Sequence, residues 1–232
     1  MGRTMPHTPR PGAPRTAALL LLLGALAYSA WVLEVVVLTG LDPVRTYVSE
    51  LAAADQPYGS LFRATDLVSG LLLLAGSCWA LLRSERRPWA VTGWAGLALF
   101  GAATAADSRL PLSCPPTVDA ACAAREAAGL VPFTHTAHAV SSSLAMVGAL
   151  VGMTALTVAA RRYRDRPLLA RTGPALVVVA LAATGWTLAA IAAMEAGNGS
   201  WALGVGQRLQ LLCVAICVAA LAAAELRRRE AR

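Results

Sequence analysis

Six apolar stretches, each long enough to cross a bilayer, constrain this chain more than any other feature. A membrane-spanning helix needs about 20 mostly apolar residues, and the stretches are Ala17–Thr39, Leu61–Leu82, Trp89–Ala106, His135–Ala160, Leu168–Met194 and Leu203–Leu226. With 57% hydrophobic and 14% charged residues, the chain is too apolar for an ordinary soluble domain. The short alternating segments of an outer-membrane barrel are absent. The sequence therefore predicts an all-α polytopic membrane protein, a bundle of six transmembrane helices in contact with the lipid bilayer.

The basic residues predict how these helices are oriented. All 20 are arginines, and 15 of them lie before the first stretch, after the second, after the fourth or after the sixth. The alternate connections hold only Arg45, Arg109 and Arg125. The positive-inside rule therefore places both termini in the cytoplasm. Because the arginine clusters are short, scattered and without interleaved aromatic residues, the net charge of +7 indicates topology and not nucleic-acid binding.

This topology divides the chain into a cytoplasmic tail (1–15), a transmembrane domain (16–227) and a second short tail (228–232), as expected for a multi-pass protein of the cell membrane. The outer connections are 40–60, 108–134 and 195–202. The lysine-free, Ala- and Arg-rich composition favours a bacterial source. Cys114 and Cys122 lie in the second outer connection, where oxidation is permitted. Pro115 and Pro116 bend the chain between them, so we predict a disulfide.

Ionisable residues within the apolar stretches lie near one side of the membrane. With the predicted topology, seven of them fall within roughly two helical turns of the outer surface: Glu34, Asp66, Asp107, His135, His138, Glu195 and Arg208. A charge in a bilayer costs about 2.5–3.5 kcal/mol on insertion scales. The seven groups therefore form either one polar site or a shared interfacial layer.

One hypothesis for this layer is a metal site. His135 and His138 are three residues apart on one helical face, and two imidazoles with a carboxylate are ligands that zinc accepts. The predicted ligands are His135, His138 and Asp107, with Glu50 or Asp66 handling the proton. Arg208 is expected to hold a substrate carboxylate or phosphate. Gln207 beside it, and Ser69 on the same helical face as Asp66, are expected to help bind the substrate.

The alternative hypothesis is structural. Histidines at a helix start often bond to a neighbouring carboxylate and so hold helices together, and Asp66 with Arg208 is a candidate ion pair. Asp107 and Glu195 lie near enough to water for solvation to suffice. A carboxylate within a span is nevertheless functional by default, which leaves Asp66 as the most informative of the seven.

Several motifs together resemble the family called domain of unknown function 998. They are the run from Tyr47 to Leu51, Leu61-Phe62-Arg63 followed by Asp66-x-x-x-Gly70, Asp107 before a loop with Cys114 and Cys122, His135-x-x-His138-x-x-Ser141, and Gly206-Gln207-Arg208. The resemblance implies a small integral-membrane protein and no particular reaction. A more distant resemblance to metal hydrolases of the alkaline-ceramidase type implies a lipid hydrolase, but this chain has six spans and two intramembrane histidines.

Two functions follow from these residues. The first is a membrane protein that binds or passes a lipid, ion or small solute through an outward-facing His/Asp/Glu site. The second is a membrane-embedded, metal-dependent enzyme that acts on a lipid-like or prenyl-type substrate at the outer leaflet.

Overall fold

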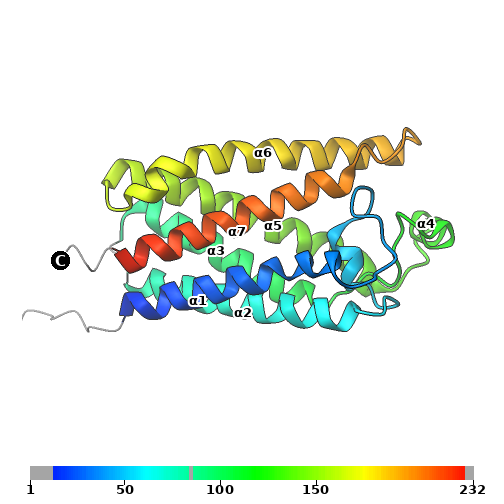
Figure 1. The fold of residues 1–232 in the computed structure, drawn as a ribbon, viewed down its shortest axis with the longest axis horizontal. Helices are drawn as coiled ribbons and strands as arrows, with labels where there is room; N and C mark the ends of the chain where they lie inside the picture. Colours follow the sequence, from blue (N-terminus) through cyan, green and yellow to red (C-terminus); the bar gives the residue numbers. More distant parts are fainter. Residues whose placement is uncertain (1–12, 84–85, 228–232) are drawn as a thin grey trace, which may run out of the picture.

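The computed structural model describes residues 13–83 and 86–227, and this part of the chain contains helices and no strand (Figure 1). The elements are α1 (Ala13–Tyr28), η1 (Ser29–Val35), η2 (Val48–Ala52), α2 (Gly59–Arg83), α3 (Pro88–Asp107), α4 (Ala120–Ala127), α5 (Phe133–Tyr163), α6 (Pro167–Glu195) and α7 (Leu203–Arg227). Of the predicted tails, residues 1–12 and 228–232 lie outside the described residues. Residues 13–15 belong to the first turn of α1.

Six helical segments in the described part of the chain have the length and hydropathy of a membrane span. They are Arg15–Val35, Gly59–Arg83, Pro88–Asp107, Phe133–Tyr163, Pro167–Glu195 and Leu203–Arg227. The predicted class, an all-α protein with six membrane spans, is therefore confirmed. The first span differs in detail, because α1 tightens into the 3₁₀ segment η1 before the chain leaves the helical path. Leu38, which was predicted to lie inside the first span, is 93% exposed beyond its end.

The six long helices form a closed ring. Each packs against two neighbours in the order α1, α2, α3, α5, α6, α7 and back to α1, and α5 also touches α7. The first turn of α1 and the last turn of α7 lie at one end of the bundle, whereas η2 and α4 lie at the other end (Figure 1). We call the second end the loop end; it corresponds to the predicted outer side.

Small residues draw α3 tightly between α2 and α5. A Cβ atom added to Gly70 of α2 would lie 2.4 Å from the backbone nitrogen of Ala105, and one added to Gly148 of α5 would lie 2.6 Å from that of Phe100. Such close approach of helix backbones is typical of membrane helices. It brings the loop ends of α2, α3 and α5 together.

The outer surface of the ring is apolar, as contact with lipid requires. Large side chains such as Leu71, Val147 and Leu188 are exposed on it, whereas Trp94 and Phe100 are buried inside the ring. Polar side chains that lie on interior helix faces are therefore shielded from lipid, and they are the ones that can form a site.

Candidate functional site

Asp66 lies on the interior face of α2. Phe62 one turn before it, and Ser69 and Gly70 one turn after it, are all buried, whereas Ala64 and Val68 are exposed toward lipid. Asp66 itself is half-buried. In the described part of the chain, no hydrogen bond or ion pair reaches its carboxylate.

Asp107, at the end of α3, forms a hydrogen-bonded network with the first turns of α5. His138 Nδ1 lies 3.1 Å from Asp107 Oδ1 and 3.0 Å from the carbonyl oxygen of Leu110. The hydroxyl groups of Ser141 and Ser142 also bond to Asp107, and Ser142 Oγ is 2.9 Å from Oδ2. Because a carbonyl oxygen only accepts, Nδ1 of His138 carries a hydrogen. Asp107 therefore accepts from three side chains, and its side chain remains 21% exposed.

Asp66 lies close enough to Asp107 and His138 for their charges to interact. Tyr28, on the buried stripe of α1, experiences the charges of both aspartates. The Tyr28 ring packs edge-to-face on Phe100 at 5.1 Å, two turns deeper along α3 than Asp107. We call Tyr28, Asp66, Asp107 and His138 the Asp66 cluster. Its floor is aromatic, and one of its two carboxylates has no hydrogen-bond partner in the described residues.

Arg208 belongs to a second network, between η1 and α7. Its guanidinium donates two hydrogen bonds of 2.6 Å to Glu34, and Nη1 donates to the carbonyl oxygens of Thr46 and Gly204. Gln207 beside it accepts a 2.6 Å hydrogen bond from the backbone of Val48. Glu34, and not Asp66, is therefore the ion-pair partner of Arg208. Two of the three residues predicted to bind a substrate, Gln207 and Arg208, instead connect the first outer connection to α7.

Glu50 joins the two long outer connections to each other. It is fully buried and accepts hydrogen bonds from the backbone nitrogen of Thr117 at 2.8 Å, from the Thr117 hydroxyl at 2.5 Å and from the backbone nitrogen of Tyr47 at 3.1 Å. Thr117 lies within the loop that the Cys114–Cys122 disulfide closes. The residue predicted to handle a proton in catalysis therefore holds the outer loops together.

Burial raises the pKa of Glu50, and the negative charge of Glu126 raises it further. The hydrogen bonds from Thr117 and Tyr47 lower the pKa, but the net shift is upward. A raised pKa means that the folded protein binds this proton more tightly than the unfolded chain does, so stability falls as pH rises above the ordinary value of 4.5. We expect Glu50→Gln to flatten the decline of the thermal unfolding midpoint above this pH. Glu195→Gln, at an exposed position, is the control, and an equal flattening by both would contradict the assignment.

His135 contacts residues on either side of the disulfide-closed loop and is not in the Asp66 cluster. Its Nδ1 accepts a hydrogen bond of 3.0 Å from the backbone nitrogen of Ser113, and its Nε2 lies 3.5 Å from a carboxylate oxygen of Glu126 on α4. His135 and His138 therefore lie on one helical face as predicted, but different loop residues hold them.

The predicted zinc ligands do not converge. In the described residues, the one group of three potential ligands whose atoms lie within 4.8 Å of one another is Cys114, Asp119 and Cys122, and both of these thiols are consumed by the disulfide. His135, His138 and Asp107 form no such group. As placed, this donor set does not fit a zinc ion.

Three participants were not predicted from the sequence: Tyr28, Thr117 and Ser142. Tyr28 and Thr117 carry no local signal, because their roles depend on segments distant in the chain. The position of Ser142 near His138 could have been predicted from the sequence, because residues four apart lie on the same helical face. Ser69, predicted to accompany Asp66, instead donates a hydrogen bond of 3.0 Å to the backbone carbonyl of Gly24.

Comparison with known proteins matches the chain to a protein family. The family model described as "Protein of unknown function (DUF998)" matches residues 21–224, which is most of the chain. No curated protein and no solved structure matches.

Proposed function

The chain belongs to the DUF998 family of integral membrane proteins, and we propose that it binds a single positively charged group at Asp66, near the loop end of its bundle. The group is a proton or a small ammonium ion, such as the headgroup of a solute or lipid. This is a narrower form of the lipid, ion or solute binding expected from the sequence.

The observation that carries the proposal is the difference between Asp66 and three other acidic groups near the loop end that are buried or half-buried. Glu34 is paired with Arg208, Asp107 with His138 and two serines, and Glu50 with Thr117. Asp66, half-buried in a span, has no such partner in the described residues. With His138 protonated, the Asp66 cluster carries a net charge of −1, which one bound cation neutralises. Carboxylate–histidine chains within spans are typical of proton and ion pathways.

Calorimetric titration of the full-length protein in nanodiscs with ethanolamine tests this proposal. We expect one equivalent to bind, with an affinity that falls as protons compete at lower pH. Asp66→Asn is expected to lose at least about tenfold in affinity, because a hydrogen bond to a charged group contributes about 1.5–3 kcal/mol. Asp55→Asn, at an exposed position of the first outer connection, is the matched control. Equal affinity of Asp66→Asn and Asp55→Asn would contradict the ammonium form of the proposal.

A second candidate function is acyl transfer, favoured by the connection Ser142–His138–Asp107. Ser142 Oγ lies 3.2 Å from His138 Nε2, and His138 Nδ1 lies 3.1 Å from Asp107, which is the order of contacts in a nucleophile–base–carboxylate arrangement. The serine hydroxyl has one hydrogen, however, and Asp107 Oδ2 at 2.9 Å competes with His138 for it. Only the rotamer that donates to His138 prepares Ser142 to attack a carbonyl carbon.

A fluorophosphonate probe distinguishes this candidate. If Ser142 is a nucleophile, its oxygen forms a bond to phosphorus, fluoride leaves, and the hydroxyl proton passes to His138. We then expect labelling of the wild type and of Ser143→Ala, whose hydroxyl donates to the backbone of Ala139, and loss of labelling in Ser142→Ala. Unlabelled wild-type protein, or labelled Ser142→Ala, would remove the acyl-transfer candidate.

A further inference from the structure

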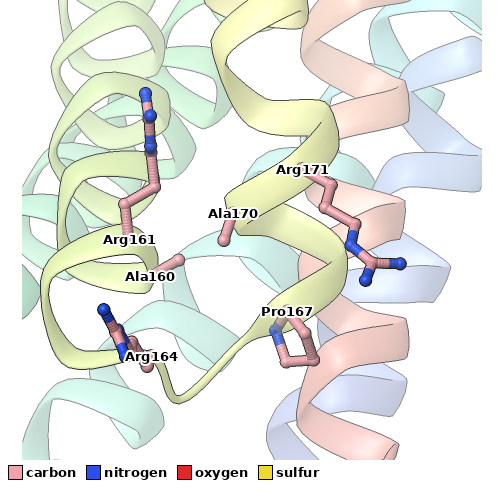
Figure 2. Close-up of a pocket in the computed structure, with 6 residues that line it drawn as sticks. All are labelled: Ala160, Arg161, Arg164, Pro167, Ala170 and Arg171. Atoms are coloured by element: carbon pink, nitrogen blue, oxygen red, sulfur yellow. The ribbon is translucent and has the colours of Figure 1, made fainter.

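A pocket of about 300 Å³ lies at the end of the bundle opposite the Asp66 cluster, in the turn between α5 and α6. It is lined by Ala160, Arg161, Arg164, Pro167, Ala170 and Arg171. Figure 2 shows Arg161 and Arg164 on the α5 side, and the other lining arginine, Arg171, extended from α6 away from the pocket. The rest of the lining is alanine and proline, so the pocket has an apolar wall and a basic rim.

The three rim arginines have no acidic partner in the described part of the chain. Their side chains are exposed, and no hydrogen bond or ion pair of theirs occurs there. The neighbouring Arg166 differs, because it is buried and pairs with Asp165 at 3.0 Å and with Glu225 at 2.7 Å. Arg166 therefore engages Asp165 of the turn and Glu225 of α7, and among the described residues neither carboxylate pairs with a rim arginine.

The backbone of the turn adds to this charge. Arg164 ends α5 in the left-handed conformation, with φ of 55°, so the chain reverses direction within a few residues. The 29-residue helix α6 then begins at Pro167, on the wall of the pocket. The first N–H groups of a helix have no partner within it, and the helix dipole gives this end a partial positive charge.

Aromatic residues at this end of the bundle place the turn at the depth of lipid headgroups. The guanidinium of Arg87 lies 4.7 Å from the ring centre of Tyr163, and that of Arg83 lies 4.8 Å from the ring centre of Trp79. Tyrosine and tryptophan concentrate at membrane–water interfaces. The pocket is therefore positioned where a phosphate group and the first part of an acyl chain meet.

We propose that this pocket binds the headgroup of an anionic phospholipid. The phosphate is held by Arg161 and Arg164 through the paired N–H groups of their guanidiniums. The exposed Arg171 side chain turns from its present direction toward the phosphate when the lipid binds. The glycerol and upper acyl carbons pack against Ala160, Pro167 and Ala170. Basic pockets between membrane helices bind lipid headgroups in this way. The site is separate from the Asp66 cluster and does not depend on the function proposed for it.

Native mass spectrometry of the purified full-length protein tests the proposal, with phosphatidylglycerol, phosphatidylcholine or inorganic phosphate added at equal concentration. We expect the wild type to retain one phosphatidylglycerol. The combined variant Arg161→Gln/Arg164→Gln/Arg171→Gln is expected to weaken its binding by roughly 100-fold, about fivefold for each arginine. The matched control Arg86→Gln/Arg162→Gln/Arg227→Gln removes the same charge from exposed positions outside the pocket and should bind nearly as well as wild type.

Three results would overturn the site. Equal loss of phosphatidylglycerol in both triple variants would mean nonspecific attraction to the basic end. Equal retention of phosphatidylcholine would mean that the phospholipid charge is not recognised, and displacement by inorganic phosphate at equal concentration would mean a soluble anion is the ligand. Because all the substituted side chains are exposed, unchanged thermal unfolding is expected, and it would show that a loss of binding is not a loss of fold.

Discussion

Arg208→Met is expected to destabilise the protein by about 3–5 kcal/mol, the typical cost of leaving one partner of a buried ion pair alone. Glu34 and Arg208 are 6% and 11% exposed at their side chains and share two hydrogen bonds of 2.6 Å. Without the guanidinium, the Glu34 carboxylate stays buried and the carbonyl oxygen of Thr46 loses a donor. The measurement is the free energy of unfolding in detergent.

The double variant Glu34→Gln/Arg208→Met separates the ion pair from the packing of the side chains. Because it leaves no unpaired charge, we expect it to be more stable than Arg208→Met alone, and the coupling energy from the double-mutant cycle to be on the order of 2 kcal/mol. Arg109→Met, at an exposed position, should change stability by less than about 0.5 kcal/mol. An Arg208→Met variant as stable as Arg109→Met would show that the network is not holding η1 to α7.

Asp66→Asn is expected to have the opposite effect on stability while removing the proposed binding. A charged side chain within a span is costly, and at Asp66 no hydrogen bond or ion pair in the described residues offsets this cost. We expect its removal to stabilise the protein by on the order of 1 kcal/mol, as is common where a functional site is not optimised for stability. The same unfolding measurement checks this.

Asp107→Asn provides the contrast, because Asp107 accepts hydrogen bonds from His138, Ser141 and Ser142. Hydrogen bonds to a charged group contribute about 1.5–3 kcal/mol each, so this variant should be less stable than wild type. If Asp66→Asn is destabilised as much as Asp107→Asn, Asp66 is a structural residue.

The spans could be predicted from the sequence because length and hydropathy are local properties. The rotation of α2 was not predicted, although the interior position of Asp66 agrees with the rule that ionisable residues within spans face the bundle interior. The pairing of Cys114 with Cys122 in the structure is the one predicted, because only eight positions separate them. These features require no knowledge of how distant segments meet.

The partners of the charged groups could not be predicted in the same way. Arg208 pairs with Glu34 across 174 positions of the chain, and this contact depends on the change from α-helix to 3₁₀ helix after Tyr28, which sets the direction of Glu34. Glu50 meets Thr117 across 67 positions because the disulfide-closed loop folds over η2. His135 and His138 share a face, yet Ser113 and Leu110 approach them separately from the preceding loop.

The central claim is that Asp66 binds a positively charged group, and infrared difference spectroscopy of the carboxyl groups tests it most directly. In full-length protein in nanodiscs, we expect a carboxyl C=O band that appears as pH falls, is suppressed by added ethanolamine and is missing from Asp66→Asn but present in Asp55→Asn. Wild-type and Asp66→Asn spectra that are identical at every pH, with and without ethanolamine, would contradict the claim.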